Sequence, residues 1–344
     1  MRRSIAIITL AISKALAGDE YPELEKRCHG KTEFDDECLS AVEGWPPLVP
    51  SNVTEFIFDI GLNGNARCGE HLNNHQACIG FEPQPNQCHH AMGAVHGNPK
   101  FRMQFTVCAA VSAGDAIMKL ARGGVSANFG SSTLLPPAGR TNDSRGIETR
   151  KWDRIAVPVL SLSRIMDWAE AGGRRSILYI KTDMQGFDFK AMASIGSRAA
   201  RIPFLKTEVW AFNLLSYSTS SVVHNDLCRD WIPHMQSLNF SVAHVSFTSG
   251  RRVFNSIKPA VSDLRSLCAW DHKRGEAPRV GLGEADVYWF HPKALEAAVQ
   301  TGSVNSGALY PPSGERWWSS EAWKKGTFFQ VPGSGKNANR LVTG

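Results

Sequence analysis

The stretch that decides the fold is Phe56-Ile57-Phe58-Asp59-Ile60-Gly61-Leu62-Asn63-Gly64. It begins as a short apolar run of aromatic and β-branched residues and ends in glycine, which is typical of a buried parallel strand that breaks into a tight turn. Glycines in such a turn let the backbone approach a ligand closely, and amides at the start of the following helix favour anionic groups. The stretch therefore predicts a first strand that leads into a ligand site.

A second short apolar strand, Ile79-Gly80-Phe81, ends in the carboxylate of Glu82 and is followed by Pro83. Glu82 comes 23 positions after Asp59. An acid about 20 residues beyond a glycine turn is where dinucleotide-type folds hold the ribose, because a carboxylate accepts hydrogen bonds from both ribose hydroxyls. The turn and the spaced acid together predict a cofactor that carries a nucleoside.

The composition is that of an ordinary globular chain, with 344 residues, 42% hydrophobic and 20% charged residues, and a formal net charge of +6. This length can bury one large core or two smaller ones. The basic residues are scattered in short clusters such as Arg174-Arg175 and Arg251-Arg252. Nucleic-acid binding needs a basic stripe interleaved with stacking aromatics, so the composition favours a solvated basic surface and no nucleic-acid partner.

Residues 1–17 have the features of a signal peptide. Arg2-Arg3 give a positive start, 5–12 an apolar run, and Ala15-Leu16-Ala17 a small-residue cleavage site. The run is too short to span a bilayer, and no later stretch reaches 18 apolar residues. The leader predicts a lumenal or secreted protein of the secretory pathway without an integral membrane segment in the mature chain; a bipartite leader directing the chain to an organelle is the alternative.

Glycosylation triplets and cysteines agree with secretory entry. The triplets begin at Asn52, Asn142 and Asn239, and the eight cysteines form an even number that permits up to four disulfides. Cys28 and Cys38 lie in a polar arm, where we predict a local bridge between them. Cys78 and Cys108 fall on predicted core strands, where a free buried thiol is the commoner state.

Strands that alternate with helical crossovers predict an α/β fold with a doubly wound, mostly parallel sheet. An N-terminal arm (18–50) precedes the main domain (51–295), and a C-terminal extension (296–344) follows, with a frayed end. The expected strands are 56–60, 79–81, 101–111, 155–160 (an edge strand because of Pro158), 176–180, 204–209, and a hairpin-like pair at 240–247 and 285–290. The expected helices are 67–76, 162–169 with Ser161 or Ser163 as cap, 187–195, and 227–238 with a kink or restart at Pro233. Long loops are expected at 122–150 and 249–284.

Acidic residues fall at or near the ends of the predicted strands: Asp59, Glu82, Asp115, Asp183 and Glu208. In a doubly wound sheet, ligands bind at the carboxyl ends of the strands near the switch point. Several acids on this one edge therefore predict the functional site.

Two groups of histidines and cysteines raise the question of a metal. Cys68, His71 and His75 share a face of the predicted helix, and Cys88-His89-His90 with His96 lie in a predicted polar loop. The first group has no fourth ligand at a suitable spacing, and the second lies in a polar loop without a C-x-x-C pair, so we predict no metal site.

Three motifs together resemble the FkbM family of S-adenosylmethionine-dependent methyltransferases. The family's D-x-G-x-N corresponds to Asp59–Asn63, its f-E-P to Phe81-Glu82-Pro83, and its K-x-D-x-E-G to Lys181–Gly186. Order and spacing match across about residues 55–250. The resemblance implies a seven-stranded class I, Rossmann-like methyltransferase fold whose final strand runs antiparallel. It also implies S-adenosyl-L-methionine as cofactor and oxygen as the methyl acceptor, on a glycan or small natural product.

The candidate cofactor-binding residues are Asp59, Gly61, Asn63, Gly64, Glu82 and Asp115, and the candidate catalytic residues are Asp183, Lys181 and Gln185. Asp183 is the candidate base or acceptor-orienting group; alternatively it caps the helix after Gly186 or holds Lys181. The chain departs from the family at Asn65, where a glycine is usual, and at Gln185, where the family has glutamate.

Two other functions compete with methyl transfer. A catalytically inactive member of the fold could act as a binding protein, since glutamine cannot take up a proton as glutamate does. A nicotinamide-dependent oxidoreductase would use a similar turn, but the chain lacks its G-x-G-x-x-G pattern around Gly61 and Gly64.

Overall fold

The computed structural model describes residues 21–28, 31, 34–62, 72, 74–96, 98–122, 134, 153–171, 175–210, 225–247 and 284–303. Its helices are α2 (Pro22–Cys28), α3 (Asp36–Ser40), α4 (Pro85–Val95), α5 (Leu162–Glu170), α6 (Asp188–Ser194), α7 (Ile232–Ser237) and α10 (Pro292–Gln300). Its strands are β1 (Glu55–Ile60), β2 (Gln76–Phe81), β3 (Gln104–Val107), β4 (Ala110–Ser112), β5 (Ala116–Arg122), β6 (Asp153–Ser161), β7 (Ser176–Thr182), β8 (Phe204–Trp210), β9 (Ser241–Phe247) and β10 (Glu284–Phe290). The expected signal peptide, most of the expected helix 67–76, the loop 249–284 and the tail beyond 303 lie outside the described residues.

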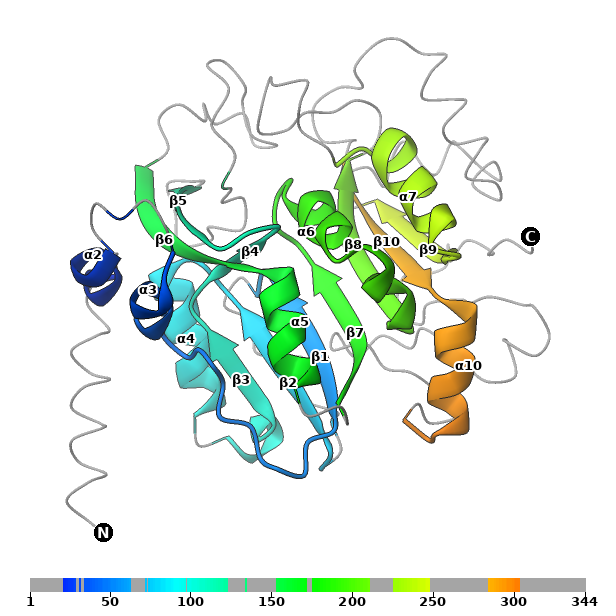
Figure 1. The fold of residues 1–344 in the computed structure, drawn as a ribbon, viewed down its shortest axis with the longest axis horizontal. Helices are drawn as coiled ribbons and strands as arrows, with labels where there is room; N and C mark the ends of the chain where they lie inside the picture. The colour runs from blue at the N-terminus through cyan, green and yellow to red at the C-terminus, as the bar shows by residue number, and fades with distance from the viewer. Residues whose placement is uncertain are drawn as a thin grey trace.

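The main sheet has seven strands in the order β3-β2-β1-β7-β8-β10-β9 (Figure 1). Neighbouring strands from β3 to β8 pair in parallel, whereas β10 is antiparallel to both β8 and β9. The predicted α/β class with a mostly parallel sheet is confirmed, as is the terminal antiparallel pair. The order of the strands changes direction between β1 and β7, which is the switch point where such sheets bind ligands.

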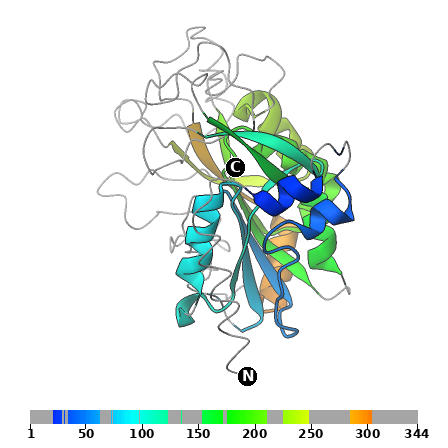
Figure 2. The same ribbon diagram turned by 90° about the vertical axis from the view of Figure 1, so that its left-hand side faces the viewer.

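The apolar residues of β1 explain why this strand is central. Phe56, Phe58 and Ile60 are buried in the main core, together with residues of α5, α6 and α7. Ile57 points to the opposite face and packs against a smaller cluster that includes α10. Figures 1 and 2 show α5 and α6 on one side of the sheet and α4 on the other. Helices on both faces account for the nearly continuous apolar run of β1.

A second sheet has three strands in the order β4-β6-β5. The single strand expected at 101–111 is wrong: β3 ends at Val107, and β4 begins at Ala110 in the other sheet. Strand β5 falls in a segment that the sequence left unassigned. The expected edge position of β6 is also wrong, because β6 is the central strand. Pro158 is tolerated there because it pairs only with β5, and the β4 ladder starts one residue later.

The N-terminal arm packs against the second sheet. Tyr21 and Leu24 are buried in one cluster with Leu120 and Val157 of β5 and β6. The arm contains the predicted Cys28–Cys38 disulfide, which is confirmed. In the described part of the chain, no helix is long and apolar enough to cross a membrane.

The expectation of free thiols at Cys78 and Cys108 is wrong. Cys108 forms a disulfide with Cys88, and Cys78 is also disulfide-bonded. Cys88 comes from α4, where the sequence predicted a polar loop. That helix begins with Pro85 at its first turn and buries Cys88 and Ala91. The polar residues Asn86, Gln87, His89 and His90 dominate its first half, so its apolar face is too short to give a helical period.

Two local predictions about helix starts are confirmed. The Ser161 hydroxyl accepts a hydrogen bond from the Arg164 amide at 3.2 Å and caps α5. Residues 227–231 form a π-helical turn, and α7 restarts directly after it with Pro233 in its first turn. Proline is tolerated in this position because first-turn amides have no partner within the helix.

Candidate functional site

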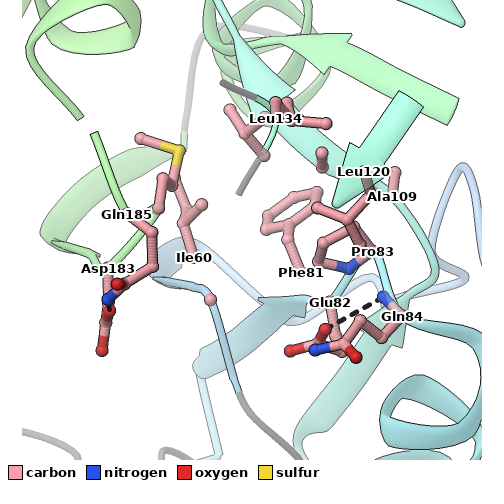
Figure 3. A pocket seen from close by; sticks show the side chains of 14 residues that line it. Ile60, Phe81, Glu82, Pro83, Gln84, Ala109, Leu120, Leu134, Asp183 and Gln185 are labelled. Carbon is pink, nitrogen blue, oxygen red and sulfur yellow. Dashed lines mark hydrogen bonds between the residues drawn. The ribbon is translucent and has the colours of Figure 1, made fainter. Parts of the chain in front are cut away.

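A pocket lies at the carboxyl ends of β1, β2 and β7, beside the switch point (Figure 3). One side is formed by residues that follow β2 and precede β4, and the other side by the turn after β7. Its lining residues are Ile60, Gly61, Phe81, Glu82, Pro83, Gln84, Ala109, Ala110, Val111, Leu120, Leu134, Asp183, Met184 and Gln185.

Glu82 is the buried acid of the first side, with 3% of its surface exposed. Its Oε1 accepts a hydrogen bond from the Gln84 amide at 3.0 Å (Figure 3). The next residue, Pro83, accepts a hydrogen bond at 3.0 Å from the Tyr21 hydroxyl of the arm. Burial, and then the charges of Glu82 and Glu43, raise the pKa of Tyr21 well above its ordinary value. The phenol therefore stays a neutral donor that fixes the start of α4 behind Glu82. Tyr21 was not predictable from the sequence, because an arm residue carries no local signal of this contact.

Gly61 lines the pocket, and it also has a structural role that the sequence did not predict. Its φ is +84°, and a Cβ there would overlap the backbone oxygen of Asp183. The turn after β7 therefore approaches Gly61 closely. A side chain at Gly61 would push the turn after β1 away from the turn after β7.

Lys181 joins those two turns electrostatically. Its ammonium lies 2.9 Å from Asp59 Oδ1 and 3.8 Å from Asp183 Oδ2, and donates to the Gly61 carbonyl at 2.9 Å. Burial alone would lower the pKa of Lys181, but the charges of Asp59 and Asp183 outweigh it and raise the pKa above its ordinary value. Lys181 is thus a permanent cation, and Asp59 is engaged beneath the pocket as its counter-ion.

Asp183 is the acid of the second side, and its side chain is 38% exposed. Its Oδ1 accepts a hydrogen bond at 3.0 Å from Gln185 Nε2, which also donates to both oxygens of Glu208 at 3.0 and 2.8 Å. Figure 3 shows Asp183 and Gln185 across the pocket from Glu82. The three predicted catalytic residues, Asp183, Lys181 and Gln185, therefore lie together in one network with Glu208.

Asp188 supports the turn that carries Asp183. Its fully buried carboxylate accepts hydrogen bonds from the amides of Met184, at 3.2 Å, and Gly186, at 3.3 Å. Burial raises the pKa of Asp188 to about 7, with the nearby charge of Asp183 adding to the effect. The role of holding the start of α6, considered above for Asp183, belongs to Asp188, which the sequence analysis did not single out.

Of the predicted cofactor-binding residues, Gly61 and Glu82 line the pocket, whereas Asp59 and Asp115 do not. Asn63 and Gly64 lie outside the described residues. Asp115 accepts hydrogen bonds at 2.6 Å from the Ser161 amide and from Arg164, and so fixes the start of α5 in a separate hollow beside Trp45 and Trp168. Asp115 thereby serves the second sheet and α5.

One cluster of potential metal ligands occurs among the described residues: Glu43, His89 and Cys108. His89 forms an ion pair with Glu43 at 2.8 Å, and this hydrogen bond raises the pKa of His89. The sulfur of Cys108 is bonded to Cys88, so it does not offer the thiolate that metal binding requires. The cluster therefore supplies a charged contact between the arm and α4.

An open, mostly parallel sheet with a pocket at its switch point is the architecture of nucleotide-cofactor enzymes. The pocket has the buried acid Glu82 at the end of β2 on one side and the more exposed acid Asp183 after β7 on the other. The family model of the methyltransferase FkbM domain matches residues 63–242, just over half of the chain. The protein therefore belongs to the FkbM methyltransferase family. No curated protein and no solved structure matches the chain significantly.

Proposed function

We propose that this protein is an S-adenosylmethionine-dependent O-methyltransferase that acts on a hydroxyl of a glycan or small natural product. The observation that carries the proposal is the pair of acids across one pocket, buried Glu82 on one side and exposed Asp183 on the other. The strand order, with β10 inserted antiparallel between β8 and β9, supports a class I methyltransferase fold.

The residues of the pocket fit this cofactor. The Glu82 carboxylate is placed to accept from the ribose hydroxyls, as acids at this position do in related folds. Phe81, Ala109 and Leu134 give the same side an apolar surface suited to the adenine ring. S-adenosylmethionine, when bound, supplies a methyl group on a positively charged sulfur. The carboxylates of this site favour a cationic ligand over a neutral one.

The chain's own contribution is to align the acceptor and to take up its proton. Asp183 is suited to both, because it is the most exposed member of the network around Lys181 and Gln185. Lys181 and Gln185 each engage one of its oxygens and so fix the direction of the carboxylate. Gln185 acts as a donor, which leaves Asp183 as the group that receives the proton.

The test has two parts. Calorimetric titration with S-adenosylmethionine and with NAD should show binding of the first and none of the second. Transfer of a labelled methyl group should then be measured over a panel of hydroxylated sugars and small molecules. Binding without transfer to any acceptor would favour an inactive binding protein, and binding of NAD alone would favour an oxidoreductase.

We also propose that the chain enters the secretory pathway and that its mature form begins near Gly18. The Cys28–Cys38 and Cys88–Cys108 bridges are compatible with an oxidising compartment. Intact mass before and after treatment with glycosidase and reductant tests the cleavage, glycan at Asn52 or Asn142, and the bridges. A retained Met1 with eight free thiols would contradict this proposal.

A further inference from the structure

Glu208 is a buried acid that the pocket does not reach. It lies near the end of β8, is 6% exposed, and is not among the residues that line the pocket. Its backbone oxygen accepts a hydrogen bond from Asn225 at 3.4 Å, which ties this end of β8 to the segment before α7. Glu208 is nonetheless connected to Asp183 in the pocket, through the side chain of Gln185.

The direction of that connection follows from the chemistry of the three groups. The carboxylates of Asp183 and Glu208 accept hydrogen bonds when ionised, so the Gln185 amide must turn its nitrogen toward them. That nitrogen carries two hydrogens. One is directed to Glu208, at 3.0 and 2.8 Å from its two oxygens, and the other to Asp183 Oδ1 at 3.0 Å. Both donors of Gln185 are therefore committed, one to each acid.

The backbone around Gln185 is held as well. Gln185 has a φ of +51° and Gly186 a φ of +104°, which are left-handed conformations that side chains disfavour. Asp188 accepts hydrogen bonds from the amides of Met184 and Gly186 on either side of this residue. With the backbone fixed by Asp188 and the amide captured by Glu208, the second N–H of Gln185 points in one direction, toward Asp183.

We propose that Glu208 is a positioning residue for methyl transfer, which acts on Asp183 through the amide of Gln185. This inference rests on the function proposed above. Glu208 holds the donor that engages Asp183 Oδ1, while Asp183 Oδ2 faces Lys181 at the longer distance of 3.8 Å. The carboxylate of Asp183 is thereby oriented from the core, by a group that touches neither cofactor nor acceptor.

The first experiment removes the charge of Glu208 and keeps its shape. Glu208→Gln places a second amide against Gln185, so Asp183 loses its fixed donor. We expect kcat to fall on the order of tenfold to a hundredfold, as for a displaced reactive group. The KM for S-adenosylmethionine should stay within about twofold, because Glu208 is outside the pocket. Glu170→Gln is the control: Glu170 pairs with Arg198 and Arg201 away from the site, so kcat should not change.

The decisive variant exchanges the two side chains, Gln185→Glu with Glu208→Gln. The exchange restores the pairing of one amide with one carboxylate between the buried positions 185 and 208, so the melting temperature lost in each single variant should return. Turnover should not return, because Asp183 then faces the carboxylate of residue 185. If kcat recovers together with stability, Glu208 has only a structural role and the inference is wrong.

Gln185→Met covers the case in which Glu208→Gln does not fold. It removes the amide at similar size and should lower kcat as Glu208→Gln does. If both fold, the double variant should be no slower than either single one, because both break the same connection. Additive losses, or wild-type kcat in either single variant, would overturn the inference.

A readout without turnover separates this inference from the proposed function. In protein labelled with 15N-glutamine, the Gln185 side-chain amide should exchange slowly, and Glu208→Gln should abolish that protection. Fast exchange in the wild type would refute the connection itself. Slow exchange in a wild type that methylates no acceptor would refute the proposed function, and the positioning role with it.

Discussion

The two sides of the pocket have the same local plan but are held by different forces. Each is a parallel strand that ends in an acid and passes through a turn into a helix, β2 into α4 and β7 into α6. The Glu82 side is fastened by the Cys88–Cys108 disulfide and the hydrogen bond from Tyr21 to Pro83. The Asp183 side is held by ion pairs and side-chain hydrogen bonds among the residues Lys181, Asp59, Gln185, Glu208 and Asp188.

The difference is between a side that is fastened covalently and a side that is held by charges. A covalent bridge and apolar packing keep their geometry at any pH. A network of charges depends on the protonation of each of its members. Substitutions on the two sides of the pocket should therefore differ in whether they change turnover, cofactor affinity, stability or its pH dependence.

The largest effect is expected at Asp183. Asp183→Asn keeps the size of the side chain and removes its basic oxygen, so methyl transfer should fall on the order of 10²–10⁴-fold. Affinity for S-adenosylmethionine, measured by calorimetry, should change little, and Gln185→Ala should be far less damaging to turnover. Asp167→Asn, on the exposed surface of α5, is the control. Equal rates for Asp183→Asn and wild type would remove Asp183 from the chemistry.

The second effect is expected from removal of the Cys88–Cys108 disulfide. Replacing Cys88 and Cys108 by serine opens a bridge between residues 20 positions apart, and the free energy of unfolding should fall by about 3 kcal/mol. Because Gln84 and Ala109 line the pocket close to these cysteines, cofactor affinity should fall too. Replacing Cys28 and Cys38 should lower stability by a similar amount and leave affinity unchanged. Denaturant titration and calorimetry measure both; equal losses of affinity would show that the bridge does not support the pocket.

Substitution of Glu82 tests the proposed role of its carboxylate in cofactor binding. Glu82→Ala should weaken binding of S-adenosylmethionine by about tenfold to a hundredfold, the value of charge-assisted hydrogen bonds of roughly 1.5–3 kcal/mol. Rates at saturating cofactor should change much less. Glu55→Ala removes a similarly buried acid at the opposite end of β1 and should not affect binding. Unchanged affinity in Glu82→Ala would refute its assignment to the cofactor.

The last effect concerns stability and its dependence on pH on the Asp183 side. The pKa of Asp188 is raised from 3.8 to about 7, so the folded state holds this proton more tightly than the unfolded chain. Its contribution to stability is therefore fully present at low pH and is lost as pH rises from about 4 to about 7. Asp188→Asn should flatten that slope in denaturant titrations over this range. An unchanged slope would show that Asp188 titrates normally in the folded protein.

Much of the fold was predictable because it depends on local patterns. The apolar run that ends in Gly61, the acid at Glu82 and the turn after Lys181 each follow from a few neighbouring residues. Their spacing also predicted that these segments meet at one edge of a parallel sheet. The restart of a helix at Pro233 and the cap at Ser161 were predictable for the same reason, since each depends on the backbone within one turn.

The features that the sequence did not predict correctly depend on contacts between segments that are far apart in the chain. Whether Cys108 is a free thiol depends on α4, which lies 20 residues earlier and has too short an apolar face to be recognised. Pro158 suggested an edge strand. Neither β5 nor β4 was recognised in the sequence, although their pairing with β6 is what accommodates the proline. The hydrogen bonds of Asp115 to the start of α5 also carried no signal in the sequence, because they depend on long-range packing.

The sequence by itself determined the mostly parallel sheet, its carboxyl-end pocket and the acids at Glu82 and Asp183, because periodicity and spacing are properties of contiguous residues. Only the tertiary structure decided how those acids are held. Glu208 comes 23 positions after Gln185, and Tyr21 is 62 positions from Pro83. Hydrogen bonds over such separations depend on how whole strands and helices pack, and that packing is a property of the entire folded chain.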